Sequence, residues 1–171
     1  IYTLKLRRRG IDLQAEQDPN VLRSLFVRDV IDREPEIIPA DAPFGDVLEL
    51  VVGSRHTAFF VADGGGELLG AISVHELRRV ILEEDSLRNV VVAADLIEES
   101  RPTLHEDDTL DLGLQLLSRS GATELAVVAR GTRRIVGALH EQDVLAAFHA
   151  QMLSRDLAGS LGTRLSLAQR G

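Results

Sequence analysis

The chain has 171 residues, and its 44% hydrophobic content is enough to bury the core of about one ordinary domain. Its 27 acidic and 19 basic side chains give a formal net charge of -8, which disfavours nucleic acid as the main partner because phosphate binding needs a positive surface. The chain has no cysteine, which excludes disulfides, thiol catalysis and cysteine-ligated metal sites. No stretch approaches the roughly 20 apolar residues of a membrane-spanning helix.

The opening segment is the most basic part of the chain. Lys5, Arg7, Arg8 and Arg9 bring four positive charges to nine residues that contain no acid. Such a cluster is commonly a solvated arm. The alternative is the cytoplasmic flank of a membrane helix that ends just before Ile1. Because the sequence starts without methionine, we expect it to be a piece of a longer protein.

An internal repeat organises the rest of the chain. The segment 28–31 resembles 94–97, which lies 66 residues later, and 69–72 resembles 136–139, which lies 67 residues later. Both halves show the same order of patterns, strand, helix, strand, strand and helix, so the predicted fold class is α/β (α+β). Since each unit is too small to close a core alone, we expect the two repeats to pack about a pseudo-twofold axis.

In the first half, a short extended segment at 36–39 precedes a helix that Asp41 caps and Pro43 begins. Its apolar side chains repeat every three to four residues, which indicates one buried face: Phe44, Val47, Leu48 and Val51. The following elements are a strand at 58–62, a glycine-rich turn, a strand at 67–72 and a helix at 73–84.

In the second half, Leu110, Leu114 and Leu117 predict a helix, and strands follow at 125–129 and 134–139. A last helix starts at about His140, and we expect glycines at 159 and 162 to interrupt any long helix after it. The predicted organisation is a linker at 1–26, a first repeat at 27–84, a connector at 85–93, a second repeat at 94–149 and a C-terminal helical tail at 150–171.

Each repeat also carries the pattern Gly-x-(Ile/Leu)-x-x-x-acid before its last helix, at 70–76 and 137–143. This repeated pattern resembles a tandem pair of CBS domains, also called a Bateman module, over about 27–149. The opening segment 1–11 resembles the juxtamembrane segment of prokaryotic CLC chloride channels and chloride/proton antiporters, where it joins the last transmembrane helix to cytoplasmic CBS domains.

The resemblance implies a regulatory and assembly module at the cytoplasmic face of the cell membrane. Its partner would be the membrane domain of the same polypeptide, whose anion transport it would modulate, and it would form a homodimer. The alternative is an adenine-nucleotide-sensing CBS pair of another protein, such as a cytosolic enzyme or a different transporter.

The resemblance further implies that AMP, ADP or ATP can occupy the cleft between the repeats as a regulatory ligand, with no required cofactor. Asp143 matches the aspartate that bonds both ribose hydroxyls, a task that suits the two acceptor oxygens of a carboxylate. Glu76 is its counterpart in the first repeat. His56 and Thr57 match an aromatic residue that stacks on adenine and the hydroxyl residue after it.

Structural roles also account for several of these residues. Ser73 and Glu76 have the spacing of a helix capping box, and Asp143 would lie in a first helical turn, where the helix dipole favours an acid. Phe60 replaces a proline common in the family, and His140 replaces the usual serine or threonine. The bulk of Phe60 could fill the cleft.

Enzyme motifs are absent from the sequence. The glycines at 64–66 are not followed by the Lys-Ser/Thr of a phosphate loop, and His75 and His140 each lack a second histidine at the spacing of a zinc-binding helix. No set of nucleophile and base stands out either. We therefore expect no enzyme, no catalytic residue and no metal site.

Overall fold

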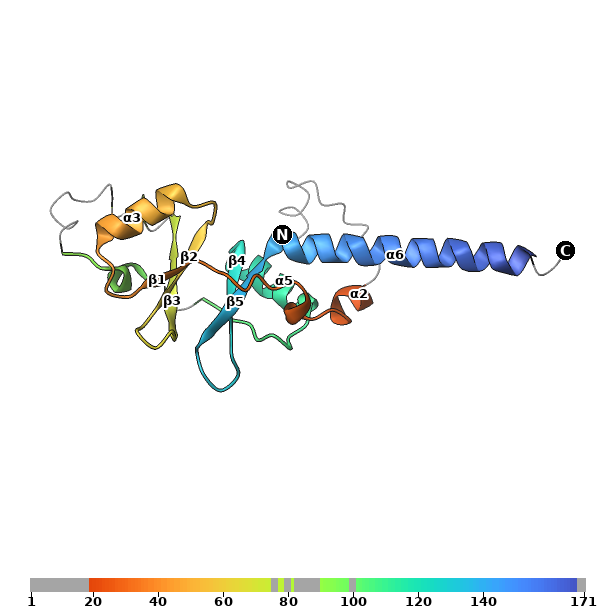
Figure 1. The fold of residues 1–171 in the computed structure, drawn as a ribbon, viewed down its shortest axis with the longest axis horizontal. Helices are drawn as coiled ribbons and strands as arrows, with labels where there is room; N and C mark the ends of the chain where they lie inside the picture. Colours follow the sequence, from red (N-terminus) through yellow and green to blue (C-terminus); the bar gives the residue numbers. More distant parts are fainter. Residues whose placement is uncertain (1–18, 75–76, 79–80, 82–89, 99–100, 169–171) are drawn as a thin grey trace.

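The computed structural model describes residues 19–74, 77–78, 81, 90–98 and 101–168. One sheet has the strand order β1 (Ile37–Pro39), β2 (Ala58–Ala62), β3 (Leu68–Ser73), and a second sheet joins β4 (Glu124–Val128) to β5 (Ile135–His140). The helices are α2 (Pro19–Arg23), α3 (Phe44–Gly53), α5 (Leu110–Ser120) and α6 (Glu141–Ala168), with short 3-10 helices η2 (Val27–Asp29) and η4 (Ala93–Leu96). Figure 1 shows α3 beside the first sheet and α5 beside the second.

The mixed α/β fold and the predicted order of elements are confirmed, and most boundaries agree within one residue. In the second repeat, the first strand is reduced to a parallel bridge between Leu104 and Val127. Of the helix predicted at 73–84, the described residues 74, 77–78 and 81 are helical, while Glu76 lies outside the described residues. The basic opening segment 1–11 also lies outside them.

The start of α3 differs from the prediction. Pro43 is the N-cap residue, and no side chain caps the helix, so the capping role predicted for Asp41 is wrong. The amide of Phe44 instead donates to the carbonyl oxygen of Val91 at 3.1 Å. A backbone carbonyl from a distant segment thus satisfies one of the amides that the first turn of a helix leaves without an intrahelical partner.

The last helix is longer than expected. α6 runs without interruption through Gly159 and Gly162, so the prediction that these glycines break it is wrong. Each glycine costs about 1 kcal/mol relative to alanine, and the surrounding leucine, alanine and arginine residues favour helix strongly enough to offset that. Figure 1 shows α6 extending well beyond the other elements. In the part of the chain that the structure describes, no helix is both long and apolar enough to cross a membrane.

The two repeats meet on a pseudo-twofold axis. A residue can touch its own counterpart in the other repeat only on such an axis, and two pairs do so: the hydroxyls of Thr57 and Thr123 are hydrogen-bonded, and Glu67 forms a β-bridge with Arg134. Between these pairs, a buried apolar cluster joins the sheets, made of Phe60, Leu68, Ala71, Ala126, Val128 and Ala138. The expected pseudo-twofold packing is confirmed.

The first segment of each repeat crosses to the other repeat. Asp32 pairs with Ala138 in the second repeat, and Glu98 pairs with Ala71 in the first. The buried clusters show the same exchange, because Val27 packs in the core of the second repeat and Leu96 in the core of the first. Each core therefore contains residues of both sequence repeats. The domain boundaries given above stay a prediction.

The repeated glycine permits this crossing. A methyl group on Gly137 would overlap the carbonyl oxygen of Asp32, and one on Gly70 would lie 3.2 Å from the carbonyl oxygen of Glu98. In both repeats, the crossing backbone therefore runs directly over the glycine Cα. This explains why the same motif position carries glycine twice.

We expect Gly137→Ala to lower the free energy of unfolding by more than about 2 kcal/mol, since the added methyl must displace a backbone segment. Gly45→Ala is the matched control, because Gly45 lies in α3 with open space around its Cα. That variant should leave stability unchanged or raise it by up to about 1 kcal/mol. Urea denaturation measures both, and equal effects would contradict the close-approach explanation.

Candidate functional site

A cleft of about 490 Å³ lies between the repeats. Its walls come from the turn before β2, the start of β4, the end of β5, the first turn of α6 and the crossing segment. The lining residues are Asp32, Arg55, His56, Thr57, Thr123, Glu124, His140, Glu141, Gln142 and Asp143. The structure thus brings all three predicted site residues, Asp143, His56 and Thr57, into one cleft.

Glu124 connects the two sides of this cleft. The backbone N–H of Thr57 donates to its Oε1 at 3.0 Å, and the Thr57 hydroxyl donates to the same oxygen at 3.2 Å. Its Oε2 lies 3.2 Å from Nδ1 of His56. The residue is only 6% exposed, so these contacts from the first repeat replace the water that its carboxylate lost.

His140 lies next to this carboxylate and is 9% exposed. Its Nδ1 lies 3.6 Å from Oε2 of Glu124, and its Nε2 lies 3.5 Å from Oδ2 of Asp32. The rings of His56 and His140 are 5.6 Å apart between centroids and tilted by 34°. The His56 ring is therefore oriented by Glu124 and faces a second imidazole.

Asp143 lies in the first turn of α6 and is half-buried at the edge of the cleft. This position agrees with both roles considered for it: an acid that the helix dipole favours in the first turn, and a carboxylate that binds ribose hydroxyls. Ser73 ends β3. The capping box predicted between Ser73 and Glu76 involves a residue outside the described ranges.

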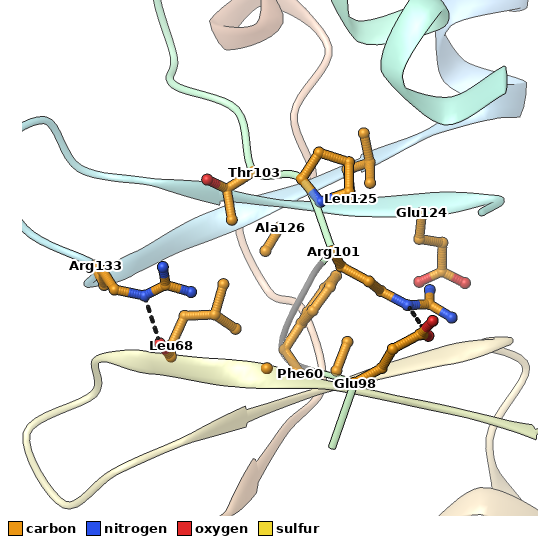
Figure 2. Close-up of a pocket in the computed structure, with 12 residues that line it drawn as sticks. Phe60, Leu68, Glu98, Arg101, Thr103, Glu124, Leu125, Ala126 and Arg133 are labelled. Atoms are coloured by element: carbon orange, nitrogen blue, oxygen red, sulfur yellow. Dashed lines mark hydrogen bonds and ion pairs between the residues drawn. The ribbon is translucent and has the colours of Figure 1, made fainter. Parts of the chain in front are cut away.

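A second pocket between the repeats has little free volume. Phe60 is 3% exposed and lines this pocket, which holds only about 10 Å³, too little for a nucleotide. Figure 2 shows two hydrogen bonds among the residues that line this pocket. Nε of Arg101 donates to Oε2 of Glu98 at 3.0 Å, and Nε of Arg133 donates to the carbonyl oxygen of Leu68 at 2.8 Å. Phe60 thus lines this small pocket and does not line the cleft at Asp143.

Sequence reasoning missed Glu124, which the structure places at the centre of the site. The sequence signal that could have found it is a single acid directly before the apolar residues 125–128. Glu124 is the first residue of β4, and all residues of this strand are buried. The predicted strand started one residue later and left Glu124 in the preceding turn. Asp32 was missed as well, because it reaches the cleft only through the crossing of its segment to the second repeat.

The cleft is rich in negative charge. Four carboxylates line it, against the guanidinium of Arg55 and two imidazoles: Asp32, Glu124, Glu141 and Asp143. Such a wall favours cations and disfavours ligands of high negative charge that arrive without a counter-ion.

Comparison with known proteins identifies the repeats. A family model described as CBS domain matches residues 27–83 and 87–150. The chain is 29% identical over 119 residues to a putative zinc metalloprotease, Rip3, of Mycobacterium tuberculosis; the match covers 69% of this chain and 30% of that protein. The chain therefore spans less than a third of the curated relative it matches.

Solved structures of low sequence identity share the fold. The crystal structure of CBSX2 in complex with AMP has a TM-score of 0.65 at 23% identity and covers 76% of this chain and 98% of its own. The CBS domain pair of protein MJ0100, in complex with 5′-methylthioadenosine and S-adenosyl-L-methionine, has a TM-score of 0.63 at 17% identity and covers 74% and 97%.

We expect Glu124→Ala to lower the free energy of unfolding by about 1–3 kcal/mol, because it leaves the Thr57 amide without its charged acceptor. Glu106→Ala is the control, since its ion pair with Arg33 is exposed and contributes little. Chemical denaturation compares the two. Similar losses would show that Glu124 does not hold the repeats together.

Proposed function

Because the chain belongs to the CBS-domain family and carries two copies of the domain, we propose that it is an adenine-nucleotide-sensing regulatory module of a larger protein, and not an enzyme. The observation that carries this proposal is the open cleft between the repeats, which gathers Asp143, His56 and Thr57. The AMP complex of CBSX2 and the S-adenosyl-L-methionine complex of the MJ0100 CBS domain pair support an adenosine ligand.

Three residues of the cleft offer groups that suit a nucleotide, although its four carboxylates oppose the charge of the phosphates. The Asp143 carboxylate can accept from two vicinal ribose hydroxyls, and the Arg55 guanidinium can bind a phosphate. The imidazole of His56 offers a flat ring at the same wall. Since Glu124 holds that ring, its orientation is set before a ligand arrives.

Regulation would follow from ligand binding at the start of α6. A ligand shifts a conformational equilibrium only when it binds one arrangement better than another. The first turn of α6 lines the cleft, and Figure 1 shows this helix extending beyond the other elements. A nucleotide at Asp143 would therefore act directly on the position of this helix.

The parent protein remains a separate proposal. The basic opening 1–11 supports a CLC-type chloride channel or antiporter, in which this module lies at the cytoplasmic face of the membrane and acts on the membrane domain of the same polypeptide. A CBS pair attached to another transporter or to an enzyme is equally open. Apolar membrane-spanning segments of the CLC type upstream of Ile1 would support the first proposal, and their absence would overturn it.

We predict saturable binding of AMP, ADP or ATP by the wild-type chain in titration calorimetry. Asp143→Ala should weaken this binding about 10- to 100-fold, because hydrogen bonds to a charged group contribute about 1.5–3 kcal/mol. Asp46→Ala is a matched control, since Asp46 also lies in the first turn of a helix but does not line the cleft. No heat with wild-type protein for any of the three nucleotides would rule the proposal out.

We also expect a homodimer, by analogy with the CLC resemblance. Sedimentation velocity at several concentrations should show a species of twice the chain mass that dissociates on dilution. A monomer at every concentration would contradict a dimer formed by this chain alone. In that case, pairing would require the effective concentration supplied by the rest of the parent protein.

A further inference from the structure

We infer that His56, Glu124 and His140 form a binding site for a divalent transition metal of the zinc class. The three residues come from separate elements: His56 precedes β2, Glu124 begins β4, and His140 ends β5. They offer two imidazole nitrogens and one carboxylate oxygen that all lie within 4.8 Å of one another. This inference does not depend on nucleotide binding.

Two of the three separations between the ligand atoms, both measured from Glu124, fit a tetrahedral ion, and all three are within 4.8 Å. With bonds of about 2.0–2.1 Å, neighbouring ligand atoms of a tetrahedral zinc site are separated by about 3.4 Å. Oε2 of Glu124 lies 3.2 Å from Nδ1 of His56 and 3.6 Å from Nδ1 of His140. The longer separation exceeds that of a hydrogen bond, but it is close to the edge of a coordination tetrahedron.

The surroundings also have the features of a metal site. Asp32 lies on the far side of the His140 ring, with Oδ2 at 3.5 Å from Nε2. A carboxylate at that nitrogen favours the tautomer that leaves Nδ1 free to bind a metal, and metal-binding histidines commonly have such a partner. Thr57 meanwhile holds Oε1 of Glu124, so the other carboxylate oxygen faces the imidazoles.

The donor set selects the kind of ion. Two nitrogen donors and one oxygen suit Zn²⁺, Co²⁺ or Ni²⁺, whereas Mg²⁺ and Ca²⁺ prefer oxygen donors alone. Three protein ligands leave a fourth position open, and these residues line the cleft. The four carboxylates of the cleft add a negative field that favours a cation.

Titration calorimetry with Zn²⁺ alone, without nucleotide, tests this inference. We expect one ion per chain, and His56→Ala and His140→Ala should each weaken binding by more than tenfold. Asp32→Asn should weaken it about 10- to 100-fold, although Asp32 would not touch the ion. His149→Ala is the matched control, because His149 lies on α6 outside the cleft and should leave the affinity unchanged.

Co²⁺ provides a second measurement that does not depend on affinity. Bound to wild-type protein, it should show the strong visible absorption of a tetrahedral ion, and both histidine variants should lose it while circular dichroism confirms that they fold. Equal Zn²⁺ affinity in wild type, His56→Ala and His140→Ala, or octahedral Co²⁺ spectra in all three, would overturn the inference.

Discussion

The structure depends on the exchange of first segments between the repeats. Each sheet alone has too few strands to bury its apolar face, and the crossing segments close both cores at once. The exchange is possible only because Gly70 and Gly137 leave no side chain beneath the incoming backbone. It also brings Asp32 to the second repeat, where it completes the cleft.

Much of the fold could be predicted because hydrophobic periodicity and the 66–67-residue offset both survive in the sequence. The crossing could not. Both repeats carry the same glycine motif, and the segment that contains Asp32 could pack over the glycine of either repeat. The sequence pattern is the same in the two cases, so it does not tell them apart. Likewise, the continuity of α6 through two glycines depends on the sum of many small helix propensities, which a single-residue rule misses.

Some of the residues that line the cleft were predicted from the sequence. The positions of Asp143, His56 and Thr57 followed from the family motif, and the structure places them together. Glu124 is 68 residues from His56, and their contact depends on where β4 begins, which periodicity defines only within one or two residues. Histidine spacing along one helix tests only for ligands that share a helix, whereas His56, Glu124 and His140 come from separate elements.

The long final helix changes how the size of a movement at the cleft should be judged. Its 28 residues span about 42 Å at 1.5 Å per residue, and its first turn lies in the wall of the cleft. A tilt of about 10° at that end would displace Ala168 by about 7 Å. Because of this length, a small rotation at the cleft end would give a displacement of several ångströms at the far end of the helix.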